Sequence, residues 1–197
     1  MTSAMKLPFV LAALVAVSIA SAQQSAIRVQ AGEVVAANNV FRDSVTGVSL
    51  TYPAGWEVLD GIRWGPENRE NTFRFRPLWP SETSPSLYYQ PFRPDNPRPA
   101  DVNAWLLENA RKKEASRQSG GGDYRNDPDS VRLRTFNGKP GLSYVATFTT
   151  RDQKMAEYNL RVVGEKYYVM FFTFGAIDDV LAVRAEIDRM AESVQVP

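Results

Sequence analysis

The side chains available for acid–base chemistry in this chain are chiefly carboxylates, because it contains neither histidine nor cysteine. This composition excludes serine–histidine and cysteine–histidine catalysis, the common zinc sites and a histidine-based pH switch. Glu67 and Glu70 are three residues apart, and two carboxylates are the minimum that glycoside hydrolysis requires. They lie in a polar segment without a further catalytic partner, so catalysis by this pair is the alternative and not the main hypothesis.

Three short motifs approach known sites but lack essential residues. The glycine triplet 120–122 follows a predicted helix, whereas a phosphate loop joins a strand to a following helix, so we interpret it as a helix stop. Asp123, Asp127 and Asp129 lack the spacing and the glycine of a helix-loop-helix calcium site, which favours a solvated turn. Ser143 follows a glycine as in a nucleophile elbow, but the second glycine is missing. We therefore expect no cofactor and no metal.

Arginine and aromatic side chains between residues 64 and 93 have the composition of a protein-binding surface. The set comprises Trp64, Arg74, Arg76, Trp79, Tyr88, Tyr89 and Arg93, and all of these except Tyr88 are our candidate partner-binding residues. The alternation in 73–76 predicts a strand whose two phenylalanines face the core while its two arginines share the other face. In the opposing interpretation, Trp79 and the tyrosines pack under the proline-rich segment and the arginines are merely solvated.

The first 22 residues have the features of a signal peptide. Lys6 supplies positive charge, residues 7–19 form an apolar run, and Ala20-Ser21-Ala22 matches a cleavage site. The run is shorter than the roughly 20 residues that a stable bilayer span needs. We expect a mature chain that begins at Gln23, is exported to the periplasm or the medium, and is soluble there without stable membrane insertion.

Charge and length restrict the partners and the organisation of the mature chain. Removing residues 1–22 leaves 197 − 22 = 175 residues and, since Lys6 is the one charged residue removed, 22 basic against 22 acidic side chains. A balanced charge argues against general nucleic-acid or anionic-membrane binding. The length suits one domain that is held together by burial without disulfides. We predict a flexible arm over 23–39, with an edge strand as the alternative, and a single domain over 40–197.

The first half of the mature chain has the periodicity of strands. Residues 41–56 alternate apolar and polar side chains around Gly47 and end in Pro53-Ala54-Gly55-Trp56, which predicts a β-hairpin followed by a turn. Seven of the 13 prolines lie in 77–99, so we predict that this segment is edge, turn or surface loop, with 87–89 as a short strand.

The second half predicts a meander between two helices. The expected elements are a helix over 101–118, strands over 131–136, 141–149, 155–163 and 166–174, and a helix over 178–194. Asp101 and Asp178 are the expected caps. The last strand is apolar on both faces, which places it in the middle of a sheet. Sequential antiparallel strands covered by helices give an α+β fold, an antiparallel meander sheet in an α/β/α sandwich.

Four segments together resemble the PsbP-like superfamily, which includes the extrinsic photosystem II subunit and a Ran-binding regulator of nuclear import. They are Tyr52-Pro53-x-Gly55-Trp56, Asn137-Gly138-x-Pro140, Gly164-Glu165-Lys166 and Met190-Ala191-Glu192-Ser193-Val194. The similarity covers about residues 41–194. It implies a PsbP-like fold and, by analogy of fold, a non-enzymatic binding or assembly role. Metal binding by histidine does not carry over, and the Ran-binding role does not suit an exported protein.

We therefore hypothesise an exported module that docks on a protein or an envelope component. The alternative is a carboxylate-dependent hydrolase that acts on an exported polymer. A cleft with at least two acids of perturbed pKa would favour the enzyme, whereas an exposed aromatic and arginine patch would favour docking.

Overall fold

A computed structural model describes residues 27–28, 34–59, 61–64, 70–77 and 83–197. The predicted signal peptide, 1–22, and the candidate residue Trp79 lie outside these ranges, as does Glu67 of the glutamate pair. The predicted arm, 23–39, is described in part, and it contains two short strands.

A ten-stranded antiparallel sheet forms the centre of the described chain. In spatial order its main path runs β1 (Ile27–Arg28), β6 (Ile62–Trp64), β7 (Glu70–Pro77), β8 (Ser86–Pro91), β13 (Tyr167–Ala176), β12 (Gln153–Val163), β11 (Lys139–Thr150) and β10 (Arg132–Phe136). Two further strands of this sheet lie beside the main path: β5 (Trp56–Val58) pairs with β7, and β9 (Arg125–Asn126) pairs with β11. A separate three-stranded sheet contains β2 (Val34–Ala37), β3 (Val40–Asp43) and β4 (Ser49–Thr51).

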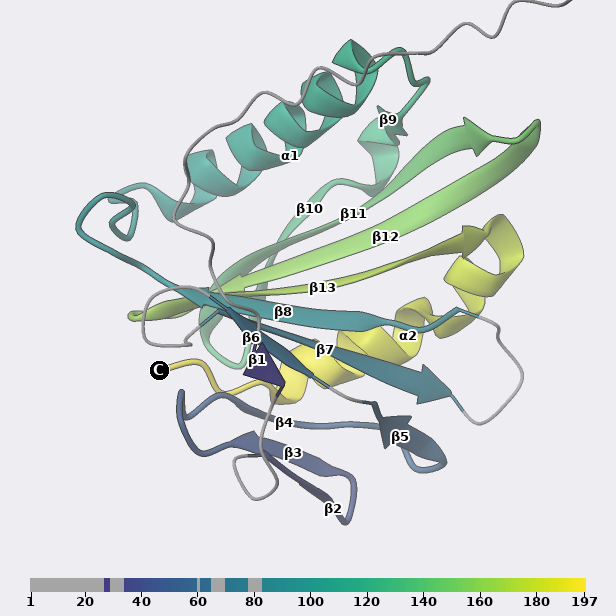
Figure 1. Ribbon diagram of the computed structural model, residues 1–197. Coiled ribbons are helices and arrows are strands. Elements are labelled where there is room, and N and C mark those ends of the chain that lie inside the picture. Colours follow the sequence, from purple (N-terminus) through teal and green to yellow (C-terminus); the bar gives the residue numbers. More distant parts are fainter. Residues whose placement is uncertain (1–26, 29–33, 60, 65–69, 78–82) are drawn as a thin grey trace, which may run out of the picture.

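The two α-helices of the described residues pack on opposite faces of the large sheet, as Figure 1 shows. Helix α1 (Val102–Ser119) covers β9 and β11, and α2 (Ile177–Ser193) covers β12 and β13 together with β4 of the small sheet. None of the helices in the described chain is long and apolar enough to span a membrane. The α+β architecture predicted from the sequence is confirmed.

Two separate apolar cores follow from the period of two along the strands. On the α2 face, Tyr158, Leu160 and Val162 of β12 pack with apolar side chains of α2 and with the small sheet. On the α1 face, Leu142 and Tyr144 of β11 pack against α1. The central strand β12 therefore supplies one face to each core, so its α1-facing side chains lie under a helix and not in solvent.

The predicted hairpins are confirmed in detail. Strands β3 and β4 pair antiparallel, and Gly47 between them has a φ of 78°. Strands β10 and β11 pair around Asn137 and Gly138, whose φ values of 46° and 74° are the two positive angles that a tight hairpin turn requires. Strand β13 lies between β8 and β12, in the middle of the sheet as predicted.

Two sequence predictions are wrong. The segment containing β8 was expected at an edge or in a loop, but β8 pairs with β7 on one side and β13 on the other. Its prolines stand at or beyond its ends, at Pro85 and Pro91, so the intervening residues keep their backbone donors. Asp178 does not cap α2, because Ala176 occupies that position without a side-chain bond; Asp178 lies in the first turn, where its charge favours the helix dipole.

Candidate functional site

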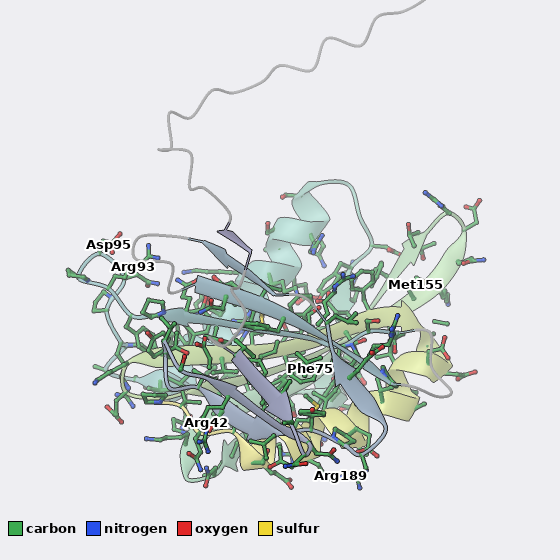
Figure 2. All side chains as sticks on the ribbon, turned by 60° about the horizontal axis from the view of Figure 1, so that its bottom comes forward. Arg42, Phe75, Arg93, Asp95, Met155 and Arg189 are labelled. Atoms are coloured by element: carbon green, nitrogen blue, oxygen red, sulfur yellow. The ribbon has the colours of Figure 1, made fainter. Side chains whose placement is uncertain are left out.

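The predicted orientation of the arginine strand is confirmed. Phe73 and Phe75 of β7 are 2% and 0% exposed, whereas Arg74 and Arg76 are exposed on the other face. Figure 2 shows Phe75 in the interior of the molecule. Strand β7 therefore presents two arginines side by side on its exposed face. The guanidinium of Arg76 forms an ion pair with Glu57 of the neighbouring strand β5.

Tyr89 does not belong to the exposed patch. It is completely buried, and its hydroxyl donates a hydrogen bond to the buried carboxylate of Asp43. The physical reason is the strand period: Tyr88, and not Tyr89, pairs with Thr72 and therefore shares the face of Arg74. Tyr88 is half-buried there.

Of the remaining candidates, Trp79 and the side chain of Trp64 lie outside the described residues, and Arg93 is not brought together with the two arginines. Trp64 is the last residue of β6, and its side chain is outside the described part of the structure. Arg93 follows the end of β8, whereas Arg74 pairs with Ser86 at the beginning of that strand. Figure 2 places Arg93 at the opposite end of the molecule from Met155.

One part of the α1-facing side of the sheet is left uncovered by the helix. We call this part, on β7, β8 and β13, the open sheet face; its residues are Thr72, Arg74, Arg76, Tyr88, Met170, Phe172 and Phe174. Phe174 is 61% exposed, while Tyr88, Met170 and Phe172 are half-buried. Beside the arginines is a hollow of about 510 Å³, lined by Val58, Leu59, Arg74, Arg76 and Ser84. Aromatic, methionine and arginine side chains thus form one continuous surface.

A larger cavity of about 740 Å³ lies where the end of α1 meets β11, β12 and β13. Its apolar lining consists of Tyr124, Phe148, Met155, Phe172 and Phe174. The rings of Tyr124 and Phe148 stack with centroids 5.9 Å apart and an interplanar angle of 25°. The volume is within the range of small-ligand sites. The lining also includes the charged residues Arg117, Asp123 and Glu157.

Two acids line this cavity, and both are engaged in the fold. Asp123 accepts hydrogen bonds from the backbone nitrogen and the hydroxyl of Thr149, each at 2.6 Å, which lowers the pKa of Asp123. Glu157 accepts a hydrogen bond from the ammonium of Lys113 at 2.5 Å. Asp127 in turn accepts from the backbone nitrogen of Asp129 in a short 3₁₀ turn. Within the described ranges no three acids gather as metal ligands.

Beneath the cavity, between α1 and the sheet, lies a group of six side chains that we call the buried polar cluster: Lys113, Tyr124, Tyr144, Glu157, Asn159 and Arg161. The Lys113 ammonium also donates to the side-chain oxygen of Asn159 at 2.8 Å. The side chains of Lys113 and Glu157 are 17% and 7% exposed. The cluster is therefore a charged group enclosed by protein.

Arg161 is the unusual member of this cluster. Its residue is 8% exposed, it forms no ion pair with a described carboxylate, and its Nε has no hydrogen-bond partner. The hydroxyls of Tyr124 and Tyr144 and the amide nitrogen of Asn159 also lack partners of good geometry. Buried polar groups are normally hydrogen-bonded, and buried charges are normally paired. The cluster consequently has more donors than acceptors.

Burial keeps the two tyrosine hydroxyls of the cluster protonated. Burial raises the pKa of Tyr144 to about 12, although the positive charge of Arg161 acts in the opposite direction. Burial and the negative charge of Glu157 also raise the pKa of Tyr124. Burial lowers the pKa of Lys113, a shift that Glu157 opposes. At neutral pH both tyrosine hydroxyls are therefore available as donors.

Sequence reasoning missed this cluster. Glu157, Asn159 and Arg161 occupy alternate positions of β12, and the positions between them are apolar, which is the usual pattern of a strand with one solvent-facing side. The sequence feature that could have revealed the cluster is on α1, where Lys113 continues the helical stripe that begins with Val102. A lysine on the buried side of a helix indicates an acidic partner on the sheet beneath it.

The fold has relatives among solved structures, although neither a family model nor a curated protein matches the chain. The solution structure of cyanobacterial PsbP (CyanoP) from Synechocystis sp. PCC 6803 aligns with a TM-score of 0.57 and 16% identity, over 80% of this chain and 91% of that protein. The fold is PsbP-like. At 16% identity this likeness concerns the fold and not the activity.

Two crystal structures align less closely. One is LpqN of Mycobacterium tuberculosis, described as involved in cell envelope biogenesis, with a TM-score of 0.46 and 11% identity over 89% of this chain and 92% of that one. The other is a Bacteroides thetaiotaomicron protein, with a TM-score of 0.48 and 9% identity over 76% of this chain and 45% of that one.

Proposed function

We propose that the chain is an exported binding or assembly module that docks on an acidic protein or envelope component through the open sheet face. The observation that carries this proposal is that α1 packs on β9, β11 and the beginning of β13 and leaves β7, β8 and the later part of β13 uncovered, with two exposed arginines beside half-buried aromatic side chains. The PsbP-like fold is compatible with this role.

The residue types on this face suit a partner that carries carboxylates. Arg74 and Arg76 project from the same side of one strand, about 7 Å apart by strand geometry, and both line the hollow of about 510 Å³. A guanidinium binds a carboxylate through two parallel hydrogen bonds, and the aromatic side chains next to it supply apolar contact area. The ion pair of Arg76 with Glu57 is exposed and contributes little to stability, so a partner carboxylate can replace it.

The alternative, a carboxylate-dependent hydrolase, has weaker support. The cavity holds the two acids that such chemistry needs, but Asp123 is held by Thr149 and Glu157 by Lys113. An acid bound in this way is poorly placed to give or take a proton in a reaction. The predicted glutamate pair lies partly outside the described residues and adds no geometry in favour of an enzyme.

Export and the domain organisation are part of the proposal and depend on the sequence. Cleavage after Ala22 gives a mature chain that begins at Gln23, with an arm over 23–39 that adds β1 and β2 to the sheets of a single domain over 40–197. The balanced charge of this mature chain is compatible with a specific docking surface instead of general attraction to nucleic acid or anionic lipid.

Charge reversal on the open sheet face tests the proposal. Because both side chains are exposed, Arg74→Glu with Arg76→Glu is expected to preserve the fold, at about 0.5 kcal/mol or less for each change, while it abolishes capture of the envelope partner that the wild type retains. Capture is measured by affinity purification from envelope extracts and quantitative mass spectrometry.

The matched control is Arg42→Glu with Arg189→Glu. Both arginines are exposed on the side of the small sheet and α2, away from the open sheet face, and the control changes the net charge by the same amount (Figure 2). Equal capture by the test variant and the wild type would remove the open sheet face from consideration. Equal losses in test and control would show nonspecific charge attraction.

A further inference from the structure

The open sheet face and the cavity at the end of α1 share two side chains. Phe172 and Phe174 of β13 belong to the open sheet face and also line the cavity, together with Phe148 and Met155. Phe174 is 61% exposed, so most of its ring is available to a partner. Aromatic side chains around a hollow are typical of the energetic centre of a protein interface. The cavity is therefore continuous with the docking surface.

Strand pairing sets the distance between this cavity and the arginines. Arg74 of β7 pairs with Ser86 of β8, and Ser86 pairs with Phe172 of β13. Directly paired residues point to the same face of a sheet, so Arg74 and Phe172 lie in one row, two strand spacings or about 10 Å apart. Because an extended chain advances about 3.3 Å per residue, about three residues of a partner span that distance.

The charges on the wall of the cavity balance one another. Glu157 accepts a hydrogen bond from the Lys113 ammonium, and the wall carries one further acid, Asp123, and one base, Arg117. A charged group that entered such a cavity would lose hydration without gaining an unpaired ion of opposite sign. The wall therefore favours an uncharged group.

The arginine end of the row has the opposite character. Arg74 is exposed and has no ion-pair partner within the described residues, and Arg76 beside it forms only the exposed pair with Glu57. Guanidinium groups in this position favour a carboxylate, which they bind through paired hydrogen bonds. One surface thus presents an uncharged cavity and, about 10 Å away, a cationic site.

The lining of the cavity suits a ring in particular. Tyr124 and Phe148 stack on one another, and Phe172, Phe174 and Met155 complete the apolar part of the wall. Aromatic rings contact one another by offset stacking or edge-to-face, and the sulfur of methionine contacts ring edges. The volume of about 740 Å³ admits a group as large as an indole ring.

We propose that the docking partner inserts one large aromatic side chain, of the size of tryptophan, into this cavity, while carboxylates about three residues away in the same extended segment bind Arg74 and Arg76. This inference rests on the proposed docking function and specifies the chemistry of the partner, which is an acidic segment with an aromatic anchor.

The test compares three synthetic hexapeptides with blocked ends. They are EESSWS, EESSAS without the aromatic ring, and KKSSWS with reversed charge. Two-dimensional NMR titration of the mature protein measures their affinities. We expect EESSWS to bind at least tenfold more tightly than either of the others. Equal affinities for EESSWS and EESSAS, or failure of the wild type to bind EESSWS, would overturn the proposal.

The methionine methyl groups report where the ring binds. Met155 lines the cavity, whereas Met190 is 0% exposed in the core beneath α2, on the other side of the sheet. The ring current of a bound tryptophan should shift the Met155 methyl signal with EESSWS and not with EESSAS, and should leave Met190 unchanged. Binding of EESSWS without a shift at Met155 would show that the ring lies elsewhere, and would overturn the assignment.

Phe174→Ala tests the wall of the cavity. Because the side chain is largely exposed, the variant is expected to fold as the wild type does and to bind EESSWS at least fivefold more weakly, with EESSAS unaffected. Leu181→Ala is the matched control, since Leu181 is a 46% exposed apolar residue of α2, on the opposite side of the sheet. The control should bind all three peptides as the wild type does.

Arg74→Glu with Arg76→Glu separates failure of this inference from failure of the docking function. We expect this variant to bind EESSWS at least tenfold more weakly and KKSSWS more tightly than the wild type does. That result together with no effect of Phe174→Ala would overturn the aromatic anchor and leave docking through the arginines intact. An effect of Phe174→Ala with none of the arginine substitutions would overturn docking through the arginines, and with it the acidic segment proposed here.

Discussion

Replacement of Glu157 by alanine is expected to destabilise the protein by about 3 to 5 kcal/mol, because it leaves the Lys113 ammonium without its carboxylate partner beneath α1. The cost is large because Arg161 lies in the same cluster, so the substitution leaves two enclosed cations and no anion. Urea unfolding followed by circular dichroism measures the change in the free energy of unfolding.

Two controls identify the cause of that loss. Glu108 forms exposed ion pairs with Arg111 and Lys112 on the outer side of α1, and Glu108→Ala should cost less than about 1 kcal/mol. Lys113→Met with Glu157→Met removes both charges of the buried pair and should cost less than the sum of the two single substitutions. Additive costs would contradict a direct interaction between Lys113 and Glu157.

Phe75→Ala is expected to cost a comparable 3 to 5 kcal/mol, roughly the range for a fully buried phenylalanine. Phe75 is 0% exposed, and its ring lies 5.9 Å from that of Phe41 and 5.8 Å from that of Tyr52, centroid to centroid. These contacts join the small sheet to the large one, so the substitution removes packing between two layers. The same unfolding measurement detects the loss.

The neighbouring residue provides the control on the same strand. Arg74→Ala changes an exposed side chain of β7 and should alter the free energy of unfolding by about 0.5 kcal/mol or less. Similar costs for Phe75→Ala and Arg74→Ala would show that the strand does not have one buried and one exposed face, and would remove the basis for placing both arginines on a docking surface.

Local periodicity was sufficient to predict most of the fold. The alternation of 73–76 correctly placed both phenylalanines inside, and Asn137-Gly138 correctly marked a tight hairpin turn. Asp101 caps α1 as expected, since its carboxylate accepts a hydrogen bond from the Ala104 backbone nitrogen. These features depend on short-range sterics and hydrogen bonds, which a few consecutive residues determine.

Features that depend on contacts between distant segments were not predictable in this way. Tyr89 was assigned to the surface because tyrosine is common at protein interfaces. In the structure it is buried in the core, where its hydroxyl donates a hydrogen bond to Asp43, 46 positions away in the sequence. Lys113 and Glu157 are 44 positions apart. The helical stripe of α1 indicates an acidic partner for Lys113, but it does not identify that partner as Glu157. The order of strands around β8 is likewise a property of the whole sheet.

The central claim, that the open sheet face binds an acidic partner, is tested most directly by site-specific crosslinking in cells that export the protein. A photoreactive aromatic amino acid replaces Tyr88, a half-buried residue of the open sheet face, or Arg189, an exposed residue of α2. We expect one discrete crosslinked adduct from position 88, which Arg74→Glu with Arg76→Glu eliminates, and no adduct from position 189. A discrete adduct from position 189 alone, or none from position 88, would contradict the claim.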